Sequence, residues 1–75
     1  MPLVRIDMVE GRPPERLERM IAEVSEAIAR SLEAPIESVR IVINELKPHQ
    51  YGVGGRAWPV VAEDRRRRQE AQEDA

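Results

Sequence analysis

The hydrophobic pattern of the first 46 residues changes its period twice, and this change constrains the fold more than any other feature. Apolar and polar residues alternate from Pro2 to Val9, as in a strand with one covered face. From about Pro14 to Glu33 the apolar residues recur at the spacing of an amphipathic helix. Alternation returns from Val39 to Leu46, in a segment rich in β-branched residues. The apolar sides of the three segments comprise Val4, Ile6 and Met8; Leu17, Met20, Ile21, Val24, Ala27, Ile28 and Leu32; and Val39, Ile41 and Ile43.

The residues between these segments are of types that end regular structure. After the first strand, Gly11 frees the backbone, and Pro13 and Pro14 cannot continue a strand ladder but suit the first turn of a helix. Pro35 ends the helix, because the residue before a proline is displaced from the helical region. Further along, the glycines between residues 52 and 55 predict a tight turn.

A strand, a long helix and a second strand predict a β-α-β unit of the α+β class. A helical crossover of this kind joins parallel strands and is right-handed in nearly all proteins. One helix covers only one face of a two-stranded sheet, and such a sheet is too small to be stable by itself. The two-layer subunit therefore has an uncovered sheet face, on which we expect partner subunits to pack.

The composition also favours association. The chain has 75 residues, enough for one domain, and a chain this short removes only about 60% of its unfolded surface from water. Small domains compensate with disulfides, metals or association. The sequence contains no cysteine and one histidine, His49, which excludes a disulfide, a thiolate metal site and a histidine cluster. An oligomer is therefore expected.

Charge and hydropathy argue against a general affinity for nucleic acid or membranes. Twelve basic and 14 acidic side chains give a net charge of −2, which offers no overall attraction to polyanions. No apolar run approaches the ~20 residues of a membrane span, and the amino terminus lacks the basic and apolar regions of a signal peptide. We therefore expect a cytoplasmic protein with neither nucleic acid nor membrane as partner.

Residues 63–75 form a highly charged segment without an apolar stripe. Arg65 to Arg68 are flanked by acidic residues on both sides. This composition predicts disorder or a frayed helix, so we place the folded domain at residues 1–62 and a charged tail at residues 63–75. Four consecutive arginines can contact phosphates, but the acidic neighbours offset them and aromatic residues for base stacking are missing.

Several short motifs, taken in their order and spacing, resemble those of one family. They are Met1-Pro2 at the head of the first strand, Glu10-Gly11-Arg12 after it, Val24-Ser25-Glu26-Ala27-Ile28, Ala34-Pro35, Val39-Arg40, and Tyr51-Gly52-Val53-Gly54-Gly55. Each fragment alone is unspecific. Together they resemble 4-oxalocrotonate tautomerase from Pro2 to about Trp58, and only the tail lies outside the resemblance.

The resemblance implies a fold, an assembly and a set of site residues. It implies the β-α-β subunit of the tautomerase superfamily, assembled as a homohexamer that is a trimer of dimers. It further implies that Met1 is removed, so that Pro2 becomes the amino terminus and the catalytic base. By the same resemblance Arg12 and Arg40 bind the substrate, with Arg40 supplied by a neighbouring subunit. Tyr51 takes the place of an aromatic residue, usually Phe, in the apolar wall of the pocket.

These residue types suit enol–keto tautomerisation, which moves a proton between oxygen and carbon. The reaction needs a base and a group that stabilises developing negative charge. The amine of a terminal proline is a rigid base, which apolar walls and nearby arginines would keep neutral. The candidates for those walls are Val9, Val53, Tyr51 and Trp58. A guanidinium binds a carboxylate through two parallel hydrogen bonds, so the arginines can orient an enol or oxo-acid. No metal or organic cofactor is required.

Each site residue also has a purely structural interpretation. Pro2 can simply begin a strand, and the two arginines can be solvated surface charges. Only the combined pattern favours a cofactor-independent tautomerase that acts on dienols of the 2-hydroxymuconate type. Two alternatives stay open: a pathway-specific, proline-dependent isomerase with a different enol or oxo-acid substrate, and a non-catalytic subunit of a hetero-oligomer. The hydroxyl of Tyr51 leaves the exact substrate undetermined.

Overall fold

The computed structural model describes residues 1–74 of the chain. The first 45 residues form one compact unit, and the residues from Leu46 onward form a second. Each unit has its own internal packing, and each is described by itself below.

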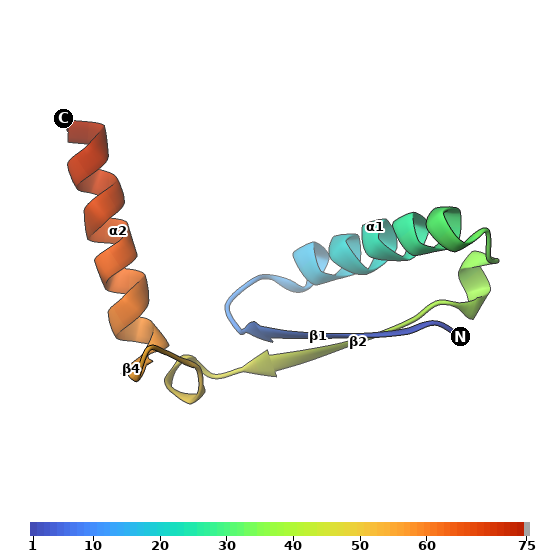
Figure 1. Ribbon diagram of the computed structural model, residues 1–75, viewed down its shortest axis with the longest axis horizontal. Coiled ribbons are helices and arrows are strands. Elements are labelled where there is room, and N and C mark those ends of the chain that lie inside the picture. The colour runs from blue at the N-terminus through green and yellow to red at the C-terminus, as the bar shows by residue number, and fades with distance from the viewer. Residues whose placement is uncertain (75) are drawn as a thin grey trace. The chain divides into compact units, whose positions relative to one another are not determined.

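The first unit has the predicted β-α-β arrangement. It comprises strand β1 (Leu3–Val9), helix α1 (Pro14–Leu32), the short 3-10 helix η1 (Ile36–Ser38) and strand β2 (Arg40–Leu46). The two strands are neighbours in one sheet, and α1 lies across one of its faces (Figure 1). Cross-strand hydrogen bonds join Arg40 to Pro2 at the strand starts and Asn44 to Asp7 further along, so the strands are parallel. The three elements predicted from the period changes are confirmed, each within one residue at either end.

The ends of α1 follow from local backbone preferences. Pro13 is the extended N-cap residue and Pro14 opens the first turn, where the missing N–H of a proline costs no hydrogen bond. At the other end Glu33 adopts a left-handed conformation with φ 53°, and the N–H of Ala34 donates to the carbonyl of Ala29 at 3.0 Å. The turn that ends the helix therefore occupies the two residues just before Pro35.

The strands alternate between a half-buried and an exposed set of side chains, as the sequence predicts. The half-buried set, on the side of α1, comprises Val4, Ile6, Met8, Ile41 and Ile43. The exposed set comprises Leu3, Arg5, Asp7, Arg40, Val42 and Asn44. Two apolar members of this outer sheet face, Leu3 and Val42, are 53% and 45% exposed. One copy of the chain therefore leaves apolar surface open on the outer face of its sheet.

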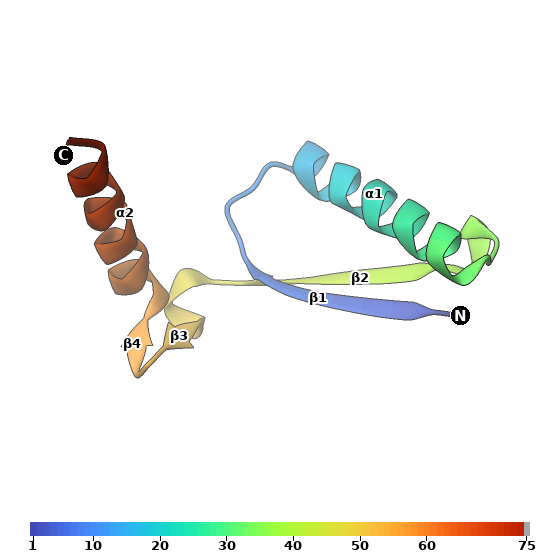
Figure 2. The same ribbon diagram turned by 45° about the horizontal axis from the view of Figure 1, so that its top comes forward.

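The second unit begins with a short 3-10 helix, η2 (Pro48–Gln50), followed by a tight hairpin. Strands β3 (Gly52–Val53) and β4 (Arg56–Ala57) pair antiparallel (Figure 2). The two residues between them, Gly54 and Gly55, have φ values of 60° and 81°. A two-residue hairpin loop of this type needs positive φ at both positions, which glycine adopts without steric cost. Gly54 and Gly55 are therefore turn residues, as predicted, whereas Gly52 belongs to strand β3.

Helix α2 (Trp58–Asp74) follows β4 directly and contacts η2 and both hairpin strands. The sequence left residues 63–75 open between disorder and a frayed helix; residues 63–74 are helical, and residue 75 lies outside the described part of the chain. The helix begins at Trp58 and runs without a break across the expected boundary between residues 62 and 63. Ion pairs from Glu63 to Arg66 and Arg67, one turn further along, accompany this helix. Of residues 1–72, only Val61 in its first turn is buried, with 8% of its surface exposed.

Neither α1 nor α2 is both long enough and apolar enough to cross a membrane.

Candidate active site

Pro2 stands immediately before β1 and is fixed to the neighbouring strand by its carbonyl group. The backbone N–H of Arg40 donates to the carbonyl oxygen of Pro2 at 2.9 Å. The bond leaves the ring nitrogen of Pro2 uninvolved. The side chain of Pro2 is half-buried, so its ring has a defined place at the start of the sheet.

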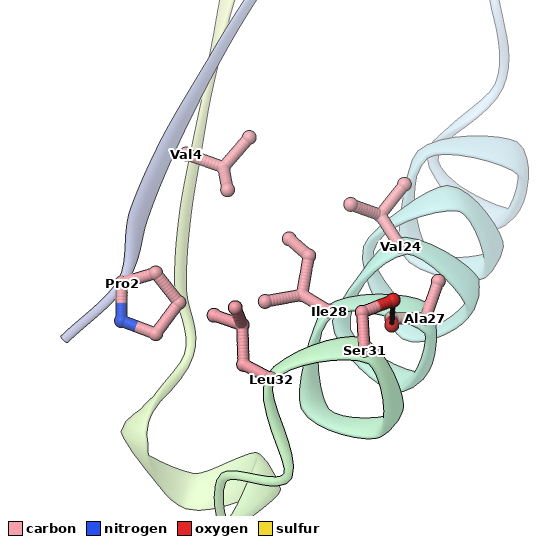
Figure 3. A pocket seen from close by; sticks show the side chains of 7 residues that line it. All are labelled: Pro2, Val4, Val24, Ala27, Ile28, Ser31 and Leu32. Atoms are coloured by element: carbon pink, nitrogen blue, oxygen red, sulfur yellow. Dashed lines mark hydrogen bonds between the residues drawn. The ribbon is translucent and has the colours of Figure 1, made fainter.

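An open apolar groove of about 450 Å³ lies beside the Pro2 ring, between β1 and the last turns of α1. Its lining consists of Pro2, Val4, Val24, Ala27, Ile28, Ser31 and Leu32 (Figure 3). The hydroxyl of Ser31 donates to the carbonyl of Ala27 at 2.7 Å, which satisfies the one hydroxyl in the lining. Leu32 remains 60% exposed at the groove. The groove therefore offers Pro2 an environment of hydrocarbon surface.

The sequence did not predict this groove. The residues of α1 that line it were interpreted as part of the helix's core-facing stripe, and Val9 was expected as a wall near Pro2. Val9 ends β1, at the opposite end of the strand from Pro2. The available signal was the carboxyl-terminal part of the apolar stripe, which contains Ile28 and Leu32.

The backbone of Arg40 is hydrogen-bonded to that of Pro2, but the two side chains lie on opposite faces of the sheet. Arg40 belongs to the exposed outer sheet face, whereas the Pro2 ring lines the groove on the side of α1. Its Nη1 donates to the carbonyl oxygen of Glu37 at 2.5 Å, in the adjacent η1. The Arg40 guanidinium of one copy is thus directed away from that copy's groove.

Arg12 lies at the far end of β1 from Pro2. It is exposed and follows Gly11, whose φ of 133° turns the chain from the strand toward α1. A seven-residue strand spans about 23 Å at about 3.3 Å per residue, and Pro2 and Arg12 lie beyond its two ends. No arginine side chain can cover that distance, so the Arg12 and Pro2 of one copy do not meet.

Tyr51, in the second unit, packs against the first residue of α2. Its ring and that of Trp58 have centroids 5.5 Å apart in an edge-to-face arrangement, a favoured geometry for aromatic pairs. The N–H of Trp58 donates to the carbonyl oxygen of Tyr51 at 2.7 Å, which closes the base of the hairpin. Much of the Tyr51 side chain is still exposed.

Helix α2 makes two further contacts, one to the hairpin and one within the helix itself. The guanidinium of Arg56 in β4 pairs with the carboxylate of Asp64, and that of Arg65 lies 5.3 Å from the ring centroid of Trp58. The hydrogen bond from Arg56, more than any other interaction, holds the pKa of Asp64 below its ordinary value. Asp64 is therefore ionised at neutral pH and available to the Arg56 guanidinium.

Comparison with known proteins identifies the family of this chain. A family model described as tautomerase enzyme matches residues 2–58. The chain belongs to the tautomerase family. It is 51% identical over 55 residues to a 2-hydroxymuconate tautomerase of Pseudomonas putida, an alignment that covers 73% of this chain and 87% of the relative. This member of the tautomerase family is accordingly an enzyme of the 4-oxalocrotonate tautomerase type, an isomerase.

Solved structures agree with the assignment to the tautomerase family. A 4-oxalocrotonate tautomerase homologue of the tomaymycin biosynthetic pathway superposes with a TM-score of 0.75 at 36% identity, over 85% of this chain and 94% of that one. A heterohexameric 4-oxalocrotonate tautomerase from Chloroflexus aurantiacus gives 0.76 at 36% identity, over 79% and 95% of the two chains. The resemblance inferred from the motifs and the α+β fold predicted from the hydrophobic periods are both confirmed. The family match ends at Trp58, so nearly all of α2 lies beyond it.

Proposed function

We propose that this chain is a cofactor-independent tautomerase that converts dienols of the 2-hydroxymuconate type to oxo-acids, with the amine of Pro2 as general base. The observation that carries the proposal is the position of Pro2: its ring lies on an apolar groove and its carbonyl is bonded to Arg40. The name of the relative with 51% identity supports the substrate class.

The proposed base requires that Met1 be removed. While Met1 is attached, the Pro2 nitrogen is part of an amide and has no basic lone pair. Removal of Met1 leaves a secondary amine in a rigid ring. The hydrogen bond from Arg40 reaches the carbonyl and not the nitrogen, so it persists after the cleavage and continues to hold the ring.

The amine must be neutral in order to accept a proton. An ordinary α-amino group titrates near ~7.7–8.0, and hydrocarbon surroundings disfavour its charged form. The groove beside Pro2 supplies such surroundings. Guanidinium groups near the amine would add to the effect, because a positive charge disfavours a second one.

Arg12 and Arg40 are proposed to bind the carboxylates of the substrate in sites of neighbouring copies. Within one copy they lie respectively beyond the far end of β1 and on the opposite sheet face from Pro2. A complete site with one proline and two guanidinium groups therefore needs residues from more than one chain. In such a site the arginines orient the substrate and stabilise the negative charge on its enolate oxygen as Pro2 moves the proton.

The proposed assembly is a homohexamer built as a trimer of dimers. The exposed Leu3 and Val42 on the outer sheet face and the absence of a closed core within residues 1–45 support association. The heterohexameric relative keeps a mixed assembly as the alternative. Pro2, Arg12 and Arg40 are all present in this chain, which favours a catalytic subunit over a non-catalytic one.

A second candidate keeps the same base and changes the substrate. Tyr51 brings a phenol to the position that we propose for the pocket wall, and the homologue of the tomaymycin pathway is a biosynthetic relative with 36% identity. A pathway-specific isomerase acting on a more polar enol or oxo-acid is consistent with both observations.

The test is an ultraviolet assay of the ketonisation of 2-hydroxymuconate by the parent and by Pro2→Ala, both without an amino-terminal tag. Pro2→Ala is expected to lose at least about a hundredfold in kcat, the scale of general-base catalysis. Equal activity of the two proteins would remove Pro2 from the mechanism. Activity only on other enol or oxo-acids, still dependent on Pro2, would favour the second candidate.

A further inference from the structure

Most of helix α2 lies beyond the residues that the family model matches, yet the helix contacts the hairpin directly. The match ends at Trp58, the first residue of α2, and the helix continues to Asp74. Its contacts are with η2, β3 and β4, and its first turn contains Val61, the buried residue noted above. The helix is therefore packed onto the hairpin at its amino-terminal end.

Two side-chain contacts connect α2 to the hairpin and to Tyr51, and a third lies within the helix. Asp64 pairs with Arg56 in β4, and Arg65 lies over the ring of Trp58. Trp58 in turn holds Tyr51 through the edge-to-face contact and through the hydrogen bond to its carbonyl. A continuous set of contacts thus runs from the second turn of α2 to the Tyr51 side chain.

The hairpin has few interactions of its own that could fix it. Each of its strands has two residues, and its loop is Gly54-Gly55. A two-stranded hairpin is marginally stable at best in water, and glycine adds conformational freedom. Contacts from outside the hairpin must therefore restrict it, and the described ones come from η2 and α2.

Most side chains of the arginine run, Arg65 to Arg68, interact with other residues of the second unit. Arg66 and Arg67 pair with Glu63, and Arg65 lies over Trp58. Three of the four consecutive guanidinium groups therefore have intramolecular partners, which argues for a structural role and against a phosphate-binding one.

We propose that Asp64 and Arg65 are positioning residues that fix the β3–β4 hairpin, and through it Tyr51, for substrate binding. This inference rests on the proposed function, in which Tyr51 forms part of the pocket wall. Since Tyr51 takes no part in the proton transfer, loosening it raises KM and leaves kcat nearly unchanged.

The experiment uses the full-length protein with Asp64→Asn and Arg65→Gln as test variants. Glu70→Gln and Arg66→Gln are the matched controls, because each makes the same kind of charge change on the same helix, and the ion-pair partner of Arg66 is Glu63. One readout is kcat and KM for 2-hydroxymuconate. The other is the fluorescence of Trp58, the only tryptophan of the chain, with its quenching by acrylamide. The second readout reports on the hairpin contacts whether or not the enzyme turns over.

The expected result is a KM increase of about two- to fivefold in each test variant, the scale of an exposed ion pair or cation–π contact. Quenching of Trp58 increases in the same variants, kcat changes less than KM, and both controls match the parent. Asp64→Glu, which keeps the carboxylate, restores most of the parental KM.

Three outcomes would overturn the inference. If the test variants match the parent in KM and in quenching, α2 has no positioning role. The proposed function would still stand in that case, provided that the activity of the parent depends on Pro2. Increased quenching of Trp58 with an unchanged KM would show that the contacts of Asp64 and Arg65 stabilise the structure without affecting substrate binding. A parent inactive on every enol acid tested would overturn the proposed function and the inference together.

Discussion

The backbone N–H of Arg40 donates to the carbonyl oxygen of Pro2 at 2.9 Å, and this bond joins the start of β2 to the residue that precedes β1. It makes the two residues neighbours in the sheet while their side chains lie on opposite faces. The proposed base and one proposed substrate ligand are thus placed by the same pair of parallel strands, but we propose that they act in the sites of different copies of the chain.

Replacing Arg12 and replacing Arg40 should impair catalysis in different ways. Arg12→Ala is expected to raise KM by about tenfold or more, because a charge-assisted hydrogen bond contributes about 1.5–3 kcal/mol. Arg40→Ala is expected to raise KM similarly and also to lower kcat, since it is proposed to stabilise the enolate. Steady-state kinetics on 2-hydroxymuconate measure both effects. Arg16→Ala, an exposed arginine of α1, serves as the control, and unchanged kinetics in both test variants would exclude the two arginines from the site.

Mixing two impaired variants should increase activity, measured at low substrate concentration, if the site is shared between copies. Pro2→Ala and Arg12→Ala chains, denatured and refolded together, would form some sites with a parental proline from one chain and a parental arginine from another. Because Pro2 and Arg12 lie beyond opposite ends of β1, such sites are expected in mixed oligomers only. Activity of the mixture well above that of either variant refolded alone confirms the sharing. A mixture no more active than its components, despite verified mixed oligomers, contradicts it.

A charge on the outer sheet face should disrupt the assembly. Val42→Glu places a carboxylate in an exposed apolar position of β2, and burying that charge in an interface without a partner is unfavourable. Size-exclusion chromatography with light scattering is expected to show smaller species than for the parent. Ala22→Glu, which adds the same charge to an exposed position of α1, should leave the mass unchanged. A monomeric parent would refute the oligomer itself.

Acid should loosen the contact between Arg56 and Asp64. The pKa of Asp64 is lowered in the folded chain, first of all by its hydrogen bond from Arg56. The stabilisation is therefore fully present above the unfolded value of about 3.9 and is lost as the pH falls through the lower folded pKa. Acrylamide quenching of Trp58 is expected to rise below about pH 4 in the parent and to be already raised, with less further change, in Asp64→Asn. Identical pH profiles for the two proteins would contradict this role of the ion pair.

The sequence predicted β1, α1 and β2 because each has a strong hydrophobic period and is bounded by glycine or proline. It left residues 63–75 open between disorder and a frayed helix, because the residues after Val61 have no apolar stripe. The observed helix α2 is accompanied by the Glu63 ion pairs and by packing of its first turn on the hairpin. The proposed site residues could be named from their motifs. Their separation within one copy depends on the length of β1 and on which face of β2 carries Arg40, and both agree with the predicted strands. The groove beside Pro2 could not be predicted, because it depends on how the end of α1 lies over the start of β1.

The central claim is that the Pro2 nitrogen is a free, neutral amine that accepts the proton. Titration of protein labelled with ¹⁵N-proline, followed by NMR, measures that nitrogen directly. The account predicts one proline signal that titrates below the ~7.7–8.0 of an ordinary α-amino group, at the same pH as the ascending limb of kcat/KM. A Pro2 nitrogen that stays an amide in the active protein, or that titrates without any matching change in kcat/KM, would contradict it.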